Sequence, residues 1–346
     1  MTTMTTPPPI NERNFRPLTL DDFIGQAQLK HTLKMMLSSA HKRNATMEHV
    51  AFFGGPGLGK TTLAAIVAAE MNSRMHEVAA PSLRRPGDLA SVLTMLQKDD
   101  VLFLDECHAL PRDVAETLYS AMEDFKVSIQ LDRESSSTAR SPITMSLHPF
   151  TLIGSTTDFG LLPEPMRARF GQSFHLQLYT ETELMRVIER AAEKLGYFME
   201  EDSLRGIAKR SRGTPRTALR LLRRCVDMAV SQDEDFIDAD LVEATMPLLG
   251  LDELGLEIAD RQYLATLIET YRGGPAGVRA IAANAGLDKS TIEQVVEPAL
   301  LMMGLIARTP RGRRVTRKGY THYRSFAPQA ASVNWNRIEA SDQAIH

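Results

Sequence analysis

The sequence predicts an α/β fold in which a parallel sheet is followed by a small helical domain and by a winged helix at the C-terminal end. Three observations carry this prediction. Apolar runs alternate with helical patterns over residues 15–180, helical spacing alone continues over 181–250, and three helical patterns precede a hairpin pattern within 256–325. Residues 1–14 and 327–346 are predicted to be a disordered arm and a tail.

Length and composition describe an ordinary globular protein. The 346 residues suffice for two or three domains with a substantial core. A net charge of −3 means that any nucleic-acid contact must come from a local basic patch. Cys107 and Cys225 lie far apart, which suits a reducing cytoplasm and argues against a disulfide framework. No apolar run approaches about 18 residues, so we expect no membrane span.

The sheet is predicted from five short apolar runs separated by amphipathic helical patterns. Strands that alternate with helices in this way pair in parallel, because each helix crosses back over the sheet before the next strand begins. The predicted strands are residues 50–53, 76–79, 101–104, 151–154 and 174–178.

A phosphate-binding loop follows the first predicted strand. The segment GGPGLGKTT at 54–62 fits the pattern G-x-x-x-x-G-K-[ST], with a strand before it and an alanine-rich helix after it. Glycines allow backbone N–H groups to approach phosphate oxygens, and the helix N-terminus adds partial positive charge. Lys60 then reaches the β- and γ-phosphates, and Thr61 offers its hydroxyl to Mg²⁺. ATP with Mg²⁺ is the predicted ligand.

Two carboxylates, Asp105 and Glu106, end the third predicted strand. Carboxyl ends of parallel strands share one edge of a sheet, so we expect both beside the phosphate loop. Asp105 would hold the Mg²⁺ shell, and Glu106 would activate the attacking water. Acids at a strand end are common, and the phosphate loop upstream is what favours this interpretation.

Further polar residues are candidates for sensing the γ-phosphate. The run 151–157 ends in hydroxyls, although an ordinary strand-end turn explains them equally well. Arg167, Arg169 and Arg216 carry planar guanidinium groups that bind phosphate oxygens in pairs. A solvated helix end is the alternative interpretation for each arginine.

A basic patch lies near the C-terminal end. Residues 308–318 contain six cations and no acid, namely Arg308, Arg311, Arg313, Arg314, Arg317 and Lys318. In a slightly acidic chain, such a patch on a predicted wing indicates binding to DNA phosphates. It contains no Asn or Gln, so we expect little sequence preference. The alternative is a solvated charge run on a terminal hairpin.

Together these motifs resemble the RuvB family of AAA+ ATPases, the branch-migration motors of Holliday junctions, over residues 15–323. The AAA+ fold comprises a P-loop NTPase core with a parallel sheet, a small helical lid domain and, in this family, a C-terminal winged helix. The passages that carry the resemblance are RPLTLDDFIGQ, GGPGLGKTTLA, RPGDLA, AMEDFK, RSRGTPR and RTPRGR.

The resemblance implies roles for single residues. It assigns the base and ribose to Phe15 and Arg16, the phosphates to Gly57, Lys60, Thr61 and Thr62, and the Walker B pair to Asp105 and Glu106. It assigns the two sensors to Thr157 and Arg216, an adenine-side contact to Tyr179, and a nucleotide-site segment to Glu123, Asp124 and Phe125. Arg169 matches the finger donated to a neighbouring subunit's ATP, and Arg308 and Arg313 match DNA contacts of the wing.

The family's assembly is a hexameric ring around duplex DNA, and the resemblance implies the same here. The segment 126–148 matches a protruding hairpin that docks on the junction-binding partner RuvA, but it is more polar over 132–138. Asp158 stands where the family commonly has arginine, Gly55 replaces a more usual proline, and Cys107 replaces an aliphatic residue.

The sequence leaves a second class of function open. An AAA+ switch or loader, of the clamp-loader or transposition-regulator type, would share the ATP core and bind DNA without processive migration. Asp158 and the polar hairpin keep this alternative in view, whereas the winged helix favours the motor. A protein unfoldase fits poorly, because residues 81–93 contain no aromatic-hydrophobic pore loop.

Overall fold

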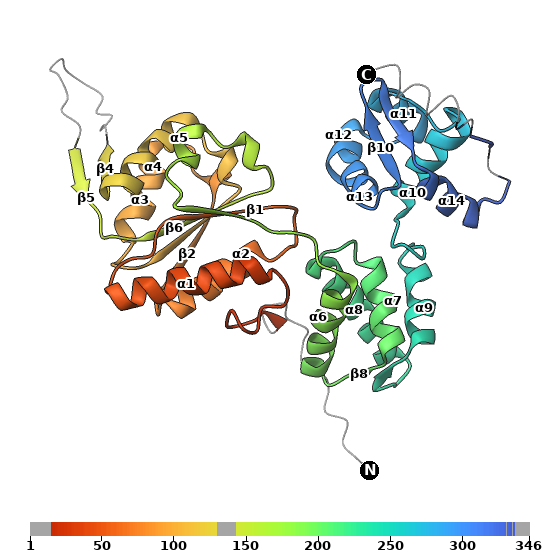
Figure 1. Cartoon of the computed structure of the whole chain (residues 1–346), viewed down its shortest axis with the longest axis horizontal. Coiled ribbons are helices and arrows are strands. Elements are labelled where there is room, and N and C mark those ends of the chain that lie inside the picture. The colour runs from red at the N-terminus through yellow and green to blue at the C-terminus, as the bar shows by residue number, and fades with distance from the viewer. Residues whose placement is uncertain (1–14, 130–142, 330, 334, 336–346) are drawn as a thin grey trace, which may run out of the picture. The chain divides into compact units, whose positions relative to one another are not determined.

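The computed structural model describes residues 15–129, 143–329, 331–333 and 335 (Figure 1). It divides into two compact units. The first comprises Met1–Gly196 with Gly213–Arg220, and the second comprises Tyr197–Arg212 with Leu221–His346.

The first unit is built on a parallel sheet of five strands in the order β2-β3-β6-β1-β7, which confirms the predicted fold class. The strands are β1 (Val50–Phe53), β2 (Met75–Ala79), β3 (Val101–Asp105), β6 (Thr151–Thr156) and β7 (Gln172–His175). β1 lies in the interior of the sheet, paired with β6 and β7.

The position of the last strand differs from the prediction of 174–178. Leu176 N still donates to Phe53 O at 2.8 Å, but Tyr179 N donates to Gly213 O at 2.9 Å. The chain therefore leaves β1 soon after His175. The apolar pattern of the sequence continues past His175, but it does not indicate at which residue the pairing with β1 ends.

Helices cover both faces of this sheet. Figure 1 shows α1 (Ala27–Arg43) and α2 (Lys60–Glu70) on one face, with α3 (Pro86–Met95) and α4 (Arg112–Asp124) on the other. The short α5 (Glu164–Arg167) follows β6, and α6 (Glu181–Leu195) follows β7. α2 starts directly after Gly59, whose φ of 101° no residue with a side chain adopts easily.

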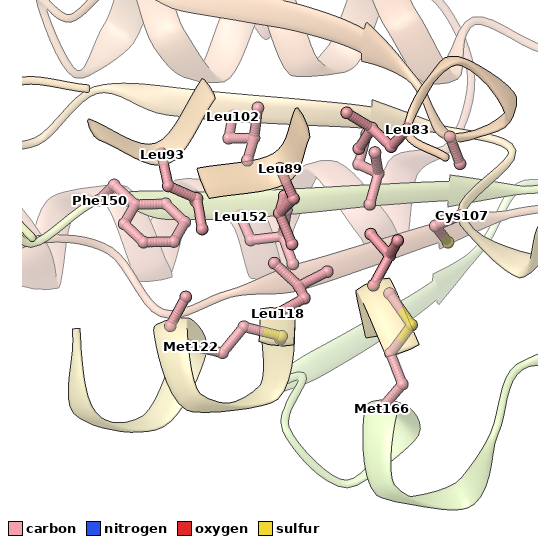
Figure 2. Packing of buried hydrophobic residues seen from close by; sticks show 14 of the residues in the cluster. Leu83, Leu89, Leu93, Leu102, Cys107, Leu118, Met122, Phe150, Leu152 and Met166 are labelled. Carbon is pink, nitrogen blue, oxygen red and sulfur yellow. The ribbon is translucent and has the colours of Figure 1, made fainter. Parts of the chain in front are cut away.

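The α3–α4 face of the sheet carries a continuous apolar core. Figure 2 shows side chains from both helices meeting strand residues, and each is almost wholly buried. The labelled members include Leu89 and Leu93 from α3, Leu118 and Met122 from α4, and Leu102 and Leu152 from β3 and β6. Burying one such side chain is worth about 1.5–3 kcal/mol, so this face holds the strand ends in place.

A two-stranded antiparallel hairpin follows α4, as the resemblance implies for 126–148. Its strands are β4 (Lys126–Ile129) and β5 (Ile143–Ser146). The hydroxyls of Ser128 and Thr144 lie 2.9 Å apart across the pair. The polar stretch 132–138 lies outside the described residues.

The helical region contains α7 (Glu201–Arg210), α8 (Pro215–Ser231) and α9 (Ala239–Leu248). The prediction that it is helical throughout is wrong, because β8 (Phe198–Met199) and β9 (Phe236–Ile237) form a short parallel pair. Strands of two residues are too short to show the alternation of apolar and polar side chains by which a strand is predicted. The stretch 247–255 contains Pro, Gly and Asp, a composition that predicts a linker, but α9 continues through Pro247 to Leu248, so the connection begins later.

The C-terminal domain is a winged helix. α10 (Ile258–Ala265) continues into a π-helical turn, Thr266–Thr270, and α11 (Val278–Ala285) follows. α12 (Lys289–Thr291), a second π-helical segment, Ile292–Val296, and α13 (Glu297–Met302) form one continuous helical stretch. β10 (Ile306–Thr309) and β11 (Gly312–Val315) form the antiparallel wing.

One helix of this domain, α14 (Arg317–Phe326), was not predicted. Arg317 and Lys318 consequently lie on a helix and not on the hairpin. Its sequence is too polar to suggest a helix, but Thr316 caps it by accepting a hydrogen bond from Gly319 N at 3.0 Å. The start of the predicted tail also packs on the domain, since Val333 is buried and Trp335 lies 5.7 Å from the ring of Tyr320.

None of the helices in the described part of the chain has the length and apolar character needed to cross a bilayer.

Candidate functional site

The loop between β1 and α2 has the backbone geometry of a phosphate cradle. Gly54, Gly57 and Gly59 all have positive φ values. A Cβ added to Gly57 would lie 2.8 Å from the Cβ of Arg216, so this position has no room for a side chain. The loop therefore keeps its backbone N–H groups accessible for an anion.

Lys60 lies buried beneath this loop. Its Nζ donates to the carbonyl oxygens of Gly54 at 2.8 Å and Gly55 at 3.0 Å. Burial lowers the pKa of Lys60, and the nearby Glu106 and Asp105 oppose this change. A cation held under the loop and flanked by two acids is placed to neutralise phosphate oxygens.

A pocket of the first unit gathers most of the residues predicted for ATP, from segments far apart in the chain. Its lining includes Phe15, Arg16, Gly57, Lys60, Thr61, Thr62, Asp105, Glu106, Thr157, Tyr179 and Arg216. The same pocket has an apolar wall formed by Phe23, Ile24, Val187, Ala191 and Leu219. Phosphate groups would meet the loop side, and a flat heterocyclic base would fit the apolar side.

Asp105 is the last residue of β3, and β6 separates that strand from β1. Its Oδ1 accepts hydrogen bonds from Ser155 Oγ at 2.8 Å and from Glu106 N at 3.0 Å. These two hydrogen bonds hold Oδ1 of the carboxylate in place. No group of three or more His, Cys, Asp or Glu side chains in the described residues could hold a metal ion. A Mg²⁺ site made by one carboxylate, the Thr61 hydroxyl and phosphate oxygens fits this arrangement.

Glu106 has an unusual backbone conformation. Its φ of 50° and ψ of 43° place it in the left-handed region, which is rare for a residue with a side chain and is often found at functional sites. Its Oε2 is buried and accepts no hydrogen bond from any described residue, while His108 Nδ1 lies 3.3 Å away. A buried carboxylate oxygen left in this state at a pocket is suited to bind a water molecule.

The two threonines at the end of β6 have different environments. Thr156 is fully buried, and its Oγ1 lies 2.8 Å from His108 Nδ1. Thr157 is exposed and lines the pocket. The next residue, Asp158, accepts a hydrogen bond from Gly160 N at 2.9 Å and caps the short turn Phe159–Leu161. Its carboxylate therefore has a local structural role.

Tyr179 and Arg216 approach the loop from the other side of the pocket. Tyr179 is buried, its hydroxyl donates to Leu58 O at 3.4 Å, and burial raises its pKa far above the ordinary value. Arg216 lies in the first turn of α8, and its backbone N donates to Gly57 O at 3.3 Å. The first turn of α8 is thus attached directly to the phosphate loop.

Four predicted nucleotide contacts are not brought to this pocket. Glu123, Asp124, Phe125 and Arg169 gather at the C-terminal end of α4 instead. Arg169 bonds Glu123 at 2.7 Å and Pro165 O at 2.8 Å, and its guanidinium lies 5.0 Å from the ring centre of Tyr119. Glu123 and Asp124 are exposed, whereas Phe125 contacts the core residue Phe150 edge-on.

The wing presents its predicted DNA contacts unequally. Arg311 is exposed at the turn, and Arg308 pairs with Arg313 across the two strands. Arg313 is only 21% exposed and places its guanidinium on the fully buried Glu297, at 2.8 and 3.1 Å. Arg308 also reaches Glu297, at 3.1 Å, but stays 55% exposed. Two of the three arginines are therefore held by a single carboxylate.

Several residues of the site were missed by sequence reasoning. Ser155 orients Asp105, His108 contacts both Glu106 and Thr156, and Tyr119 lies against Arg169. No motif marks such supporting residues. The apolar wall of the pocket is partly visible in the sequence, because Val187 and Ala191 recur at helical spacing on α6. The same spacing is equally typical of core residues, so it does not indicate a pocket.

Comparison with known proteins gives a consistent result over all three regions. The family model of the Holliday junction DNA helicase RuvB P-loop domain matches residues 15–176. The RuvB AAA lid domain matches residues 179–252, and the RuvB C-terminal winged helix domain matches residues 253–324.

Relatives and solved structures agree with these matches. The Holliday junction branch migration complex subunit RuvB of Fervidobacterium nodosum is 47% identical over 309 residues, covering 89% of this chain and 88% of that protein. The corresponding subunit of Ligilactobacillus salivarius is 44% identical, covering 90% and 92%. The structure of the Thermotoga maritima RuvB Holliday junction branch migration motor has a TM-score of 0.79 at 46% identity, covering 89% of this chain and 98% of that one.

Proposed function

The chain belongs to the RuvB family, and we propose that it uses its nucleotide pocket and its winged helix to drive branch migration of Holliday junctions. It is an ATP-hydrolysing DNA motor. The observation that carries this conclusion is the single pocket in which the phosphate loop, Asp105, Glu106, Thr157 and Arg216 converge. The switch or loader alternative is not favoured, because the P-loop, lid and winged-helix models all match in order.

We propose the following division of labour in the pocket. Thr61 and Asp105 would hold Mg²⁺, which supplies positive charge to the phosphate oxygens. Lys60 neutralises the β- and γ-phosphates. Glu106 orients the attacking water and accepts its proton, for which its buried Oε2, which accepts no hydrogen bond from the described residues, is suited. Thr157 detects the γ-phosphate through its hydroxyl.

The position of Arg169 supports a site shared between copies of the chain. Its guanidinium lies with Glu123 and Tyr119, outside the pocket that the same chain forms. An arginine placed there can stabilise transition-state charge only on a nucleotide bound by a neighbour, and such fingers contribute about 10³–10⁵-fold to turnover. We propose that the active assembly is a ring, with a hexamer as the expected size.

The proposed DNA contacts are phosphate contacts through Arg308, Arg311 and Arg313. Arg311 and Arg308 expose their cationic groups, and the wing offers no base-reading amide, so binding should fall steeply between about 50 and 200 mM salt. The hairpin at 126–148 is the proposed attachment point for a RuvA-like junction-binding protein.

A synthetic four-way junction tests the function. ATP-dependent separation of its arms, measured with and without a RuvA partner, is expected for the wild type and should be absent for Lys60→Ala. Binding of the junction without any movement would instead indicate the switch.

Mixed assemblies test the shared site. Arg169→Ala alone should lose about 10³-fold or more of its hydrolysis. Mixing it with Lys60→Ala should restore part of the activity, because an intact pocket of one variant then meets an intact finger of the other. If no mixture restores hydrolysis, Arg169 does not act on a neighbour's nucleotide.

A further inference from the structure

We propose that Arg212 and Asp260 form a clamp that makes the helices α7 and α9 move with the winged helix as one body. Arg212 is then a positioning residue for DNA movement. The proposal rests on the proposed motor function. It concerns residues 249–257, which connect α9 to α10 and which several hydrogen bonds hold in place.

Arg212 makes the first set of hydrogen bonds to this connection. Its side chain is only 14% exposed, and Nε and Nη2 donate to Gly255 O at 2.9 and 2.7 Å. Nη2 also donates to Asp260 Oδ2 at 2.5 Å. Asp260 is 2% exposed, and the same oxygen accepts a hydrogen bond from Glu257 N at 2.8 Å, at the start of α10. One guanidinium thus holds both the connecting loop and the first helix of the winged helix.

Arg210 and Asp252 make the second set. Arg210 is 6% exposed and donates to Asp252 O at 3.2 Å while its two terminal nitrogens each lie 2.8 Å from Glu243 on α9. The Asp252 carboxylate accepts from Leu256 N at 2.8 Å and lies 2.9 Å from His322 Nε2 on α14. The loop is therefore bonded to helices on each side of it.

The backbone of this connection is tightly packed against α7. Gly255 has a φ of 74°, and a Cβ added there would lie 2.3 Å from Arg210 O. Buried ion pairs with fixed hydrogen bonds are screened little by salt and resist displacement. A flexible linker would allow α7 and α9 to rotate without moving the wing. A connection held by buried ion pairs and hydrogen bonds instead transmits a small rotation of these helices to the wing.

The clamp also begins close to the nucleotide pocket in sequence. Only Gly213, Thr214 and Pro215 separate Arg212 from Arg216, which lines that pocket. The ring of Pro215 restricts the backbone of this short connection. A change at Arg216 upon hydrolysis thus has a short covalent path to the clamp.

Three single variants test the proposal in the full-length protein. Arg212→Ala removes the clamp, and Asp260→Asn removes its ion pair while keeping an oxygen that can accept from Glu257 N. Arg205→Ala is the matched control, because Arg205 lies on α7 and its ion pairs with Glu201 and Asp202 are local and solvent-exposed. For each protein, ATP hydrolysis, duplex affinity and junction migration are measured together.

We expect the two clamp variants to hydrolyse ATP and bind duplex within about two-fold of the wild type, but to migrate junctions about ten-fold more slowly per ATP hydrolysed. The Arg205→Ala protein should match the wild type. An unchanged ratio of migration to hydrolysis in both clamp variants would overturn the proposal, even if both activities fell together. Failure of the wild type to migrate junctions would count against the proposed function instead.

A distance measurement keeps the proposal testable if a clamp variant folds poorly. Cys107 and Cys225 are buried, so spin labels would attach to Asp240→Cys on α9 and Ala280→Cys on α11, both of which are exposed. The distribution of distances between the labels should be narrow with the clamp intact and broad with Asp260→Asn. An equally broad distribution in the protein with the clamp intact would also overturn it.

Discussion

The buried carboxylate of Glu297 offers the most quantitative test of how the wing is held. Glu297 is fully buried and accepts hydrogen bonds from Tyr263 at 3.0 Å, from Arg313 at 2.8 and 3.1 Å, and from Arg308 at 3.1 Å. Glu297→Gln keeps the volume and one oxygen but removes the charge on which both guanidinium groups converge. Breaking a buried pair from one side costs about 3–5 kcal/mol.

The exposed fractions of the two arginine side chains determine how large a loss of unfolding free energy we expect within this range. Arg313 is 21% exposed, so most of the cost applies to it, whereas the 55% exposed Arg308 contributes less than about 1 kcal/mol. The amide of Gln retains one acceptor, which favours the lower end. We therefore expect the winged helix to lose about 3 kcal/mol of unfolding free energy, a fall in melting temperature of about 12–24 °C for a domain of this size.

Trp335 provides the assay. It is the single tryptophan of the chain, and it packs on Tyr320 and lies 5.4 Å from the guanidinium of Arg317, so its fluorescence reports on the winged helix. Urea unfolding of the full-length protein is followed by this signal. Glu293→Gln is the control, because Glu293 is 38% exposed and its ion pair with Lys289 is local, so its removal should cost less than about 0.5 kcal/mol. A loss below about 1 kcal/mol for Glu297→Gln would refute the reasoning.

Three further predictions concern the ATPase unit. Glu106→Gln should keep ATP binding and lower turnover about 10²–10⁴-fold, measured by nucleotide titration and phosphate release; equal losses in both would contradict its role with water. Leu118→Ala should lower the unfolding free energy by about 2–5 kcal/mol in urea titrations, whereas the 61% exposed Leu161→Ala should cost less than about 0.5 kcal/mol. Burial holds the pKa of His49 below its ordinary 6.5. As pH falls through about 6.5, His49 is therefore protonated in the unfolded chain before it is protonated in the folded protein, and the contribution of His49 to the stability of the fold decreases. The stability difference between wild type and His49→Gln should therefore shrink from pH 8 to pH 5.5, and a constant difference would contradict this.

Much of the first unit could be predicted from local sequence. The strand Val50–Phe53, the glycine loop after it and the carboxylates that end the third strand are consecutive in the chain. Their order implies a parallel sheet, and a parallel sheet brings their ends to one edge. The phosphate loop, Asp105 and Glu106 of the pocket were accordingly predicted, together with Thr157, which directly follows β6.

Other features depend on partners that no local pattern reveals. Asp105 is oriented by Ser155, fifty residues away, and the pocket's apolar wall comes from helical positions that look like ordinary core. The cluster of Glu123, Asp124, Phe125 and Arg169 lies apart from the pocket although the motifs suggested one site. The strands β8 and β9 and the helix α14 were missed because their local signals are weak.

The sequence by itself determined the order of the domains, the identity of the phosphate loop and the chemistry available at the strand ends, because glycine spacing and apolar periodicity act over a few neighbouring residues. The tertiary structure alone decided which charges are fixed and which are accessible. Arg313 lies on Glu297, Arg212 lies on Asp260, and Arg311 faces solvent, although all three look alike in sequence. Burial creates this difference, since a charge removed from water must have a partner, and that partner is chosen by folding in three dimensions.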